Sequence, residues 1–414
     1  MKNGPLYPRF VETSLEEAIS DTPVVLIHGP RQCGKTTLAQ TFGEARGYAY
    51  FSFDDDIVAT AARTDPAGFV ANLPTKTILD EVQHAPELFS SLKIAVDRDR
   101  TPGRFILTGS ANALLVPRLA DSLAGRMEIL RLHPLSQCEL TGVRPDFLDR
   151  LFDTGFPMRP RDRLGDKLVT RIVAGGYPTA LARSTHRRQA AWYRDYIGTL
   201  IQRDVQDLAR IRNLDVFPRL LALAAGQTAQ LRNVADLAGP FQLSRPTIQE
   251  YITLLEAIFL IDILPPWHSN RLKRLVKSPK IHIGDTGVAC ALLDVDRQSL
   301  AEDRDTLGRL LETFVFQELR RQGSWHPNAL RFHHFRDRDG YEVDIVLERT
   351  GQRIAGIEVK ASATVRDRDF RGLRKLRSAS GKRFAAGIVL YDGETCAGFG
   401  DDLYAVPIRT LWES

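Results

Sequence analysis

Short apolar runs alternate with helix-like segments along the first third of the chain. Each run is short enough for a buried strand, and the first ends in Gly29 and Pro30. The predicted strands lie within residues 24–29, 48–56, 76–81, 104–112 and 126–136, and the clearest predicted helix lies within 36–45. Strands that alternate with helices are typical of a parallel sheet with helices on both faces. We therefore expect an α/β fold for this part of the chain.

Helical periodicity replaces this alternation in residues 137–215. Pro157 and Pro160 interrupt the pattern, because proline breaks a helix interior. The longest predicted helix covers 187–211, and its apolar face holds Trp192, Tyr196, Leu200 and Ile201. We expect a helical lid or linker in this part of the chain.

Residues 231–264 have the pattern of a helix, a turn, a second helix and a strand. Ser244 is placed to cap the second helix, and Pro246 falls in its first turn. The inner face of that helix holds Ile248, Tyr251, Ile252 and Leu255. This spacing fits a winged helix-turn-helix. Its wing would be residues 264–285, where the basic residues are Arg271, Lys273, Arg274, Lys277 and Lys280. Such a unit either contacts DNA through its second helix and basic wing or serves only protein contact, and the sequence leaves both open.

The pattern changes again near residue 308. A predicted helix covers 307–323, and predicted strands lie within 341–348, 354–362, 385–393 and 403–412. Side chains alternate along a strand with period two, so Glu358 and Lys360 share one face. Asp344 lies on the neighbouring strand, and the helix carries Glu312. We therefore expect a second α/β domain with charged residues on adjacent elements.

The composition is that of an ordinary soluble globular protein, with 43% hydrophobic and 26% charged residues among 414. No apolar run approaches the ~20 residues of a membrane span, and the N-terminus lacks the apolar core of a signal peptide. The four cysteines contain no CxxC pair, which argues against a zinc site and a disulfide framework. We expect a cytoplasmic protein with no membrane partner. Its net charge of +5 permits a polyanionic partner without requiring one.

The first strand leads into a glycine-rich loop with the residue types of a phosphate site. Residues 29–36 match GxxxxGK[ST] between a strand and a helix. Backbone N–H groups and the helix N-terminus would cradle phosphates, Lys35 would reach the β- and γ-phosphates, and the Thr36 hydroxyl would bind Mg²⁺. The predicted cofactors are therefore ATP and Mg²⁺. The predicted nucleotide-binding residues are Gly29, Pro30, Arg31, Gln32, Cys33, Gly34, Lys35, Thr36 and Thr37.

Two further predicted strands end in polar residues that suit the same chemistry. Asp80 would hold the Mg²⁺ through water, and Glu81 would orient or deprotonate the attacking water. On the next strand, the hydroxyl groups of Thr108 and Ser110 could sense the γ-phosphate. Ser110 could equally serve as an ordinary helix cap.

With these motifs in place, residues 23–136 resemble an AAA-type ATPase module. The stretches GPRQCGKTT, LDEVQ, LTGSAN, LAGR and HPLS are similar to one bacterial and archaeal family, in which an AAA-like ATPase precedes a C-terminal domain of unknown function. The resemblance implies an arginine finger, for which Arg126 is the first candidate and Arg118 the second. A finger acting in trans would require a homo-oligomer, whereas either arginine could equally form a structural ion pair. Cys33 departs from the family, whose members often carry an aliphatic residue there.

The C-terminal pattern resembles the D…ExK core of restriction-endonuclease-like nucleases. The resemblance implies a second Mg²⁺ at Asp344, Glu358 and the Val359 carbonyl, with Glu312 as the helix acid of the same metal site. Lys360 would steady the attacking water. The alternative is an inactive nuclease fold that serves as a binding platform. Downstream, a predicted helix suits either a nucleic-acid backbone or a solvated face; its basic residues are Arg366, Arg368, Arg371, Arg374, Lys375 and Arg377.

These patterns together predict four parts. They are an AAA-type ATPase core with a parallel sheet (1–136), a helical lid or linker (137–215), a winged helix-turn-helix (216–290) and a restriction-endonuclease-like α/β domain (291–414). Three hypotheses of function follow. ATP drives or licenses a nuclease acting on DNA or RNA, or the chain is a nucleotide switch that binds nucleic acid or protein without cleaving it. In the third, it belongs to a toxin–antitoxin or defence system.

Overall fold

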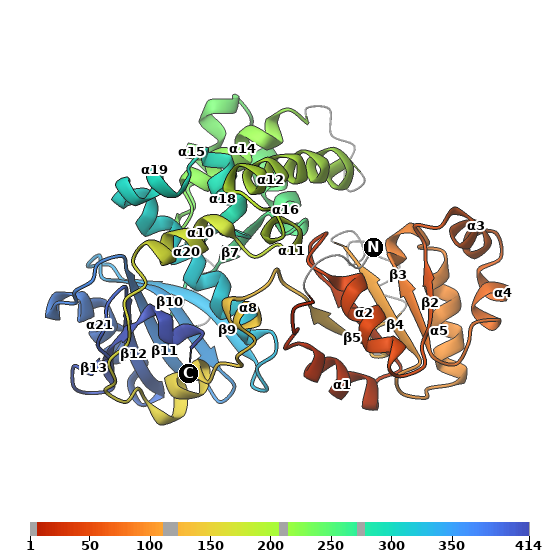
Figure 1. The fold of residues 1–414 in the computed structure, drawn as a ribbon, viewed down its shortest axis with the longest axis horizontal. Coiled ribbons are helices and arrows are strands. Elements are labelled where there is room, and N and C mark those ends of the chain that lie inside the picture. The colour runs from red at the N-terminus through yellow and green to blue at the C-terminus, as the bar shows by residue number, and fades with distance from the viewer. Residues whose placement is uncertain (1–5, 111–122, 207–213, 271–277, 414) are drawn as a thin grey trace.

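The computed structural model describes residues 6–110, 123–206, 214–270 and 278–413. Figure 1 shows an N-terminal sheet with its helices on the right, a C-terminal sheet at the lower left, and a mainly helical part above that second sheet. Within these four described ranges, no helix combines the length and the apolar character needed to cross a membrane.

The N-terminal sheet has five strands in the order β2-β3-β4-β1-β5, and every neighbouring pair is parallel. The strands are β1 (Val24–His28), β2 (Ala49–Ser52), β3 (Thr77–Asp80), β4 (Phe105–Gly109) and β5 (Met127–Arg131). The predicted α/β fold with a parallel sheet is therefore confirmed. Parallel strands end at a common edge, so the residues that follow β1, β3 and β4 meet there.

Helices cover both faces of this sheet, because β1 is apolar on both sides. Val25 and Ile27 pack with α1 (Glu12–Asp21) and α2 (Lys35–Glu44). Val24 and Leu26 pack into a second cluster on the opposite face. The helices of that second face are α3 (Asp56–Thr64), α4 (Pro66–Ala71) and α5 (Leu88–Arg98), and the short η1 (Val82–His84) follows β3.

Residues 137–226 are mainly helical and pack around a group of aromatic side chains. The elements are α8 (Gln137–Thr141), α9 (Phe147–Asp149), η2 (Arg150–Thr154), α10 (Asp166–Ala174), α11 (Pro178–Leu181), α12 (His186–Leu200), η3 (Ile201–Val205) and α14 (Val216–Gly226). Trp192 stacks on Tyr196 with ring centroids 4.9 Å apart, and Tyr177 lies 4.9 Å from the Tyr196 ring. The helix predicted over 187–211 thus begins as α12, continues as the π-helical turn η3, and leaves the described residues after position 206.

A three-stranded antiparallel sheet and two helices follow. The elements are β6 (Gln230–Leu231), α15 (Val234–Ala238), η4 (Gly239–Phe241), α16 (Arg245–Ala257), β7 (Ile261–Leu264) and β8 (Lys280–Ile283), with strand order β6-β8-β7. Ser244 caps α16 as predicted, since its Oγ accepts a hydrogen bond from the Thr247 N–H at 3.3 Å. The predicted inner face is buried, and it consists of Ile248, Tyr251, Ile252 and Leu255.

The prediction that Lys280 belongs to a basic wing is wrong. It opens β8, is buried, and forms ion pairs with Glu312 and Asp344 in the C-terminal part. The alternation of β8 explains the error, because Lys280 and His282 share one face of a strand whose two faces are both buried. The other predicted wing residues, Arg271, Lys273, Arg274 and Lys277, lie outside the described residues.

The C-terminal sheet is mixed and has six strands in the order β13-β14-β12-β11-β10-β9. Its strands are β9 (Leu330–Arg336), β10 (Glu342–Arg349), β11 (Arg353–Lys360), β12 (Phe384–Tyr391), β13 (Ala397–Gly398) and β14 (Leu403–Pro407). The helices that follow β8 are α18 (Thr286–Leu293), α19 (Arg297–Glu302), α20 (Arg304–Gly323), η5 (Asp367–Phe370), α21 (Arg371–Ser380), η6 (Gly381–Arg383) and η7 (Ile408–Leu411). Of these, α18 and α19 lie with the helical part in Figure 1. Helix α20 covers one face of the sheet and α21 the other, so the predicted second α/β unit is present.

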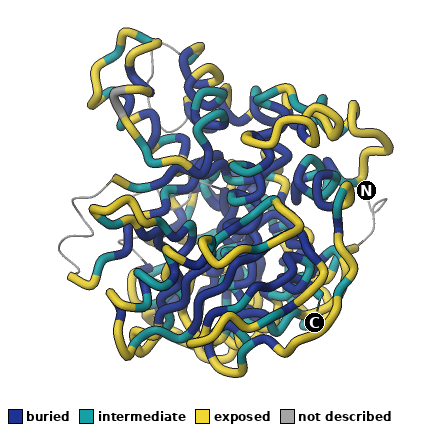
Figure 2. Tube along the Cα trace, turned by 90° about the vertical axis from the view of Figure 1, so that its left-hand side faces the viewer, coloured by how far each residue is buried: buried dark blue, intermediate teal, exposed yellow. Residues whose placement is uncertain are grey.

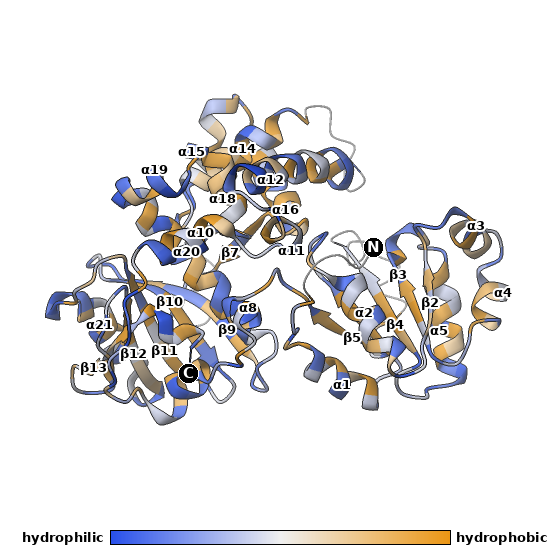
Figure 3. Cartoon of the chain, viewed as in Figure 1, coloured by the Kyte–Doolittle hydropathy of each residue, from blue (hydrophilic) through white to orange (hydrophobic). Residues whose placement is uncertain are grey.

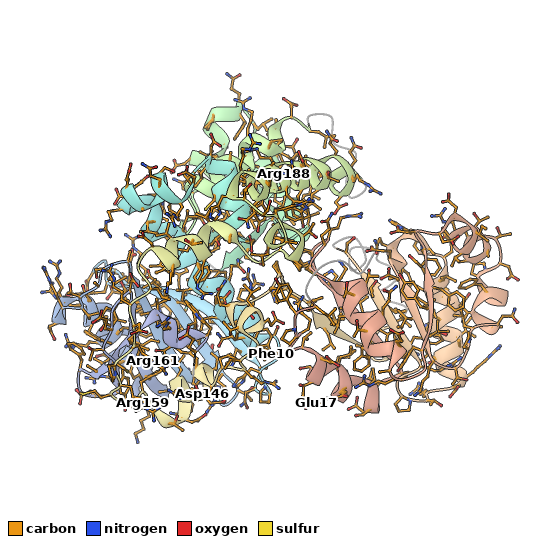
Figure 4. The ribbon with its side chains drawn as sticks, in the orientation of Figure 1. Phe10, Glu17, Asp146, Arg159, Arg161 and Arg188 are labelled. Carbon is orange, nitrogen blue, oxygen red and sulfur yellow. The ribbon has the colours of Figure 1, made fainter. Side chains whose placement is uncertain are left out.

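One hydrophobic core joins α8, the helical part and one face of the C-terminal sheet, from Cys138 to Trp412. The buried residues of this core run through the interior in Figure 2. Strands β3 and β4 are largely hydrophobic in Figure 3, whereas α21 is largely hydrophilic. Phe10, labelled in Figure 4, lies between the N-terminal sheet and the C-terminal sheet. Its ring meets the Trp325 ring edge-on, with the ring centroids 5.6 Å apart. The domain boundaries given above stay predictions.

Candidate functional site

The phosphate loop begins directly after β1, and its backbone requires glycine at two positions. Gly34 has a φ of +103°, a left-handed conformation that favours glycine. A Cβ atom on Gly29 would lie 2.0 Å from the carbonyl oxygen of Leu132, which follows β5. The loop can therefore keep this path only while both residues lack a side chain.

Lys35 opens α2, and its ammonium group lies inside the loop. Nζ donates hydrogen bonds to the carbonyl oxygens of Gly29 at 3.0 Å and Pro30 at 2.9 Å, and the residue is only 4% exposed. A phosphate also attracts the ammonium group as an opposite charge, which a neutral carbonyl oxygen does not. An entering phosphate can therefore replace these two carbonyls at the same ammonium group.

The remaining predicted nucleotide-binding residues differ in exposure. Pro30 and Cys33 are buried, Arg31 and Thr36 are half-buried, and Gln32 and Thr37 are exposed. The Cys33 Sγ lies 3.6 Å from the Leu132 carbonyl oxygen, and burial raises the pKa of this thiol. Cys33 therefore fills space beneath the loop and is closed to solvent.

Asp80, at the end of β3, collects hydroxyl groups from three neighbouring elements. Thr36 Oγ1 lies 3.0 Å from Asp80 Oδ1, and the Tyr50 hydroxyl donates to Oδ2 at 2.8 Å. Thr108, on β4, donates a further hydrogen bond to Oδ1. Burial raises the pKa of Asp80, and these donors oppose that shift by favouring the carboxylate. The predicted pair of Thr36 and Asp80 is therefore in contact, with hard oxygen ligands of the kind that Mg²⁺ prefers.

Glu81 follows Asp80 and turns the chain away from the sheet. Its backbone is left-handed, with φ at +57°, and its N–H donates to Thr108 Oγ1 at 3.0 Å. Gln83 Nε2 donates to the Glu81 carboxylate. Such a conformation is uncommon for a residue with a side chain and often marks functional positions. It directs Glu81 to the same sheet edge as the loop.

Ser110 directly follows β4 and is fully buried. Its Oγ has no hydrogen-bond partner among the described residues, which end at this position before resuming at 123. A buried hydroxyl group without a partner is costly. Its role as a γ-phosphate sensor stays a prediction, which this geometry leaves open.

Arg126 lies at the opposite edge of the sheet from the phosphate loop. It precedes β5, whose first residue pairs with Val24 at the start of β1, whereas the loop follows the end of β1. Arg126 forms two hydrogen bonds to the Asp97 carboxylate, at 2.6 and 3.0 Å. A finger role in trans stays a prediction, and Arg118 falls outside the described residues.

Two arginines hold the loop to the rest of the protein. Arg9 donates to the Cys33 carbonyl oxygen at 2.7 Å and to Glu139 Oε1, on α8, at 2.9 Å. Arg31 Nε lies 2.8 Å from Asp204 Oδ1, on η3, and the Tyr196 hydroxyl donates to the Arg31 carbonyl oxygen at 3.1 Å. The loop is therefore bonded to the helical part from both sides.

Arg9, Tyr50 and the pairing of Asp204 with Arg31 are contacts of the site that the sequence pattern did not predict. A parallel register brings the strand containing Tyr50 beside the strand that ends in Asp80, but strand order is not written in the local pattern. Arg9 and Asp204 reach the loop through tertiary packing. Arg9 is a charged residue between a proline and a phenylalanine, which is a weak signal, whereas Asp204 lies in a polar stretch and carries no local signal.

A second polar cluster lies between α20, β8, β10 and β11. Lys280 Nζ is 2.7 Å from Glu312 Oε1 and 3.2 Å from Asp344 Oδ1. Lys360 Nζ is 2.8 Å from Glu358 Oε1, so these two residues lie on the same face of β11, as the alternation predicted. The structure therefore brings together all four predicted C-terminal residues and adds Lys280.

Burial and neighbouring charges shift the pKa values of the groups in this cluster. Burial raises the pKa of Glu358 to about 8, and the Asp344 carboxylate adds to this shift. Burial also raises the pKa of Glu312. Burial opposes the positive charge of Lys280, but Asp344 and Glu312 outweigh it and raise the pKa of that amine above its usual range. Lys280 is therefore a charged ammonium group.

The residues do not fit the divalent metal that the D…ExK pattern implies. Among the described residues, no group of three or more His, Cys, Asp or Glu side chains is arranged to hold a metal ion. Asp344 Oδ2 instead accepts the Val359 N–H at 2.9 Å, and a lysine lies between Asp344 and Glu312.

Comparison with known proteins places the chain in a family. Residues 21–141 match the family model "AAA domain", and residues 165–299 and 307–411 match two domains of unknown function, DUF8612 and DUF4143. The chain is 31% identical over 394 residues to the uncharacterized protein Rv2008c of Mycobacterium tuberculosis, covering 95% of this chain and 82% of that protein. The chain belongs to the family of this mycobacterial protein. Its N-terminal part is a P-loop AAA ATPase domain, which supports nucleotide binding and hydrolysis.

More distant relatives share most of the chain's length. The uncharacterized protein MJ1544 of Methanocaldococcus jannaschii is 23% identical over 383 residues, which cover 89% of this chain and 81% of that protein. Among solved structures, the Walker-type ATPase PABY2304 of Pyrococcus abyssi is 18% identical and covers 69% of this chain and 96% of its own, with a TM-score of 0.44. The RuvB Holliday junction branch migration motor of Thermotoga maritima is 17% identical and covers 62% and 89%, with a TM-score of 0.30. Both TM-scores are below 0.5, so neither structure assigns a function to this chain.

Gly29→Ala should disrupt the phosphate loop, because the new Cβ would lie 2.0 Å from the Leu132 carbonyl oxygen. Overpacking of this kind costs about 1–3 kcal/mol. We expect a lower melting temperature and weaker ATP binding by calorimetry. Gly308→Ala is the matched control: no atom lies within 4 Å of its Cβ, and alanine should stabilise α20 by about 0.5–1 kcal/mol. Unchanged ATP affinity in Gly29→Ala would show that the loop does not depend on this close approach.

Proposed function

We propose that this protein is a nucleotide-dependent switch, which hydrolyses Mg²⁺-bound ATP at the phosphate loop and transmits the bound state to the helices that contact the loop. The supporting observation is that residues of the loop bond in two directions. Lys35 lies inside the loop beside the contact between Thr36 and Asp80, and Arg31 bonds outward to Asp204.

The residues at the sheet edge divide the chemistry among them. Lys35 would exchange its two carbonyl partners for oxygens of the β- and γ-phosphates. Thr36 and Asp80 would hold the Mg²⁺ of the substrate, whose charge neutralises the phosphates. Glu81 would orient the attacking water and accept its proton.

Transmission would begin at Arg31, because this residue belongs to the loop itself. Its guanidinium group bonds to a buried carboxylate on η3, and its carbonyl oxygen accepts from Tyr196 on α12. A loop that rearranges around phosphate must move Arg31 relative to both partners. Since α12 and η3 pack into the core shared with the C-terminal sheet, a shift of these helices would reach the rest of the chain.

Nucleic-acid binding stays a prediction alongside this proposal. The four basic wing residues at 271–277 lie outside the described residues. On α21, acidic residues offset much of the predicted positive charge: Arg374 pairs with Asp367, Lys375 with Asp339, and Arg377 with Asp401. This pairing favours the solvated face over a phosphate-binding face for that helix. The homo-oligomer and the defence-system role likewise stay predictions.

Two substitutions separate binding from hydrolysis. Lys35→Ala should weaken ATP binding about 10- to 100-fold, since a hydrogen bond to a charged group contributes about 1.5–3 kcal/mol.

Glu81→Gln should bind ATP normally and turn it over about 10²–10⁴-fold more slowly, because the amide cannot accept the proton. Calorimetry and a phosphate-release assay measure the two effects. Lys167→Ala and Glu87→Gln, at exposed positions on α10 and before α5, are matched controls. Normal turnover by Glu81→Gln would move the water-orienting role to another residue.

The pair formed by Arg31 and Asp204 should couple the loop to the helical part. In a double-mutant cycle of Arg31→Ala and Asp204→Asn, we expect a coupling of about 1 kcal/mol or more in the free energy of unfolding. We also expect this coupling to change when ATP is bound. The control pair is Arg336 and Glu342, an exposed ion pair between β9 and β10 of the C-terminal sheet, whose coupling should be about 0–1 kcal/mol and should not change with ATP. Equal coupling with and without ATP would contradict the proposed transmission.

A further inference from the structure

We propose that the Lys280 ammonium group is the resident cation of the C-terminal acidic cluster, and that this cluster excludes a divalent metal as long as Lys280 is present. The inference concerns a site separate from the ATP site and does not depend on the proposed function. It starts from the placement of Lys280 between the two carboxylates of Glu312 and Asp344.

Lys280 is held in this position by its backbone as well as by its charge. It belongs to β8, the middle strand of its sheet, and pairs with Leu231 on one side and Leu264 on the other. Its side chain is only 6% exposed. A lysine on a flexible surface loop could leave its carboxylates easily, but a lysine on a strand paired along both edges has little freedom to withdraw.

Four of the six carboxylate oxygens that a metal could use are already engaged. Glu312 Oε1 and Asp344 Oδ1 accept from Lys280, Asp344 Oδ2 accepts the Val359 N–H, and Glu358 Oε1 accepts from Lys360. In the described part of the cluster, only Glu358 Oε2 is both buried and without a partner. Mg²⁺ demands near-octahedral oxygen ligands at about 2.0–2.1 Å, so it could enter only by breaking several of these bonds.

Charge decides against a metal that enters while Lys280 stays. A divalent ion carries twice the charge of a monovalent cation, so Lys280 would repel it twice as strongly at the same distance. The cluster already holds two ammonium groups against three carboxylates. A divalent ion would therefore have to displace Lys280, and it would leave that ammonium group buried without a partner, which is strongly unfavourable.

The same contacts give the cluster a structural role. Lys280 comes from the sheet that contains β6 and β7, Glu312 from α20, and Asp344 from the C-terminal sheet. Breaking a buried ion pair by removing one partner is strongly destabilising, because the other charge remains. The lysine thus joins three elements that are far apart in the sequence.

Mn²⁺ binding to the full-length, nucleotide-free protein tests this inference. Electron paramagnetic resonance counts bound Mn²⁺, and thermal unfolding with and without Mn²⁺ gives a second measurement. Wild type and Asp344→Asn should bind equal amounts of Mn²⁺, because the cluster takes none in either protein. Lys280→Met should bind one additional ion, and Lys280→Met combined with Asp344→Asn should lose it. Mn²⁺ at 100 times its dissociation constant for the cluster should stabilise the Lys280→Met protein through mass action. The wild-type protein should gain no stability from this cluster, because the cluster binds no Mn²⁺.

Lys360→Met is the matched control, because it removes the other ammonium group and keeps Lys280, so it should gain no ion. A Mn²⁺ ion bound by wild type and lost in Asp344→Asn would overturn the inference, and this comparison holds even if Lys280→Met fails to fold. A folded Lys280→Met protein with an unchanged Mn²⁺ count would also overturn it, because the ammonium group would then not be what excludes the metal.

Discussion

The buried carboxylate of Asp80 is the interaction on which the nucleotide site depends. A carboxylate loses its hydration when it is buried, and only hydrogen bonds from the protein can replace it. Thr36, Tyr50 and Thr108 supply those bonds from α2, β2 and β4. Each bond to a charged group contributes about 1.5–3 kcal/mol. The need to satisfy this one group therefore fixes the relative positions of the loop helix and two strands at the sheet edge.

Further buried or half-buried charges connect the parts of the chain. Arg9 joins the phosphate loop to Glu139, Arg131 at the end of β5 reaches Asp262 on β7 at 3.4 Å, and Lys280 joins β8 to the C-terminal sheet. These groups require specific partners, unlike apolar residues, which tolerate many neighbours. They give the junctions between the ATPase domain, the helical part and the C-terminal sheet a defined geometry.

Local patterns in the sequence were sufficient for the loop and the sheet. The requirements at Gly34 and Lys35 arise within a few residues of chain, so the motif alone predicts them. The motif also places a glycine at position 29, but the close approach that requires it comes from Leu132, after β5. Asp80 could be added because parallel strands end at one edge. Tyr50 and Asp204 could not, since their roles depend on strand order and on packing between parts that burial of apolar surface decides. Lys280 was misplaced because its basic neighbours suggested a wing. Lys280 and His282 also alternate with isoleucines, a pattern typical of a strand with one solvent-facing side, whereas packing buries both faces of β8.

Hydrogen exchange of residues 190–206 tests the central claim most directly, because these residues span the ends of α12 and η3 that bond to Arg31. The account predicts that Mg²⁺-ATP changes the exchange protection of this segment in wild type and leaves it unchanged in Lys35→Ala, at a nucleotide concentration that saturates wild type but not the variant. Exchange that does not respond to Mg²⁺-ATP in wild type, at concentrations where calorimetry shows the nucleotide bound, would contradict the claim that the loop transmits its state to the helical part.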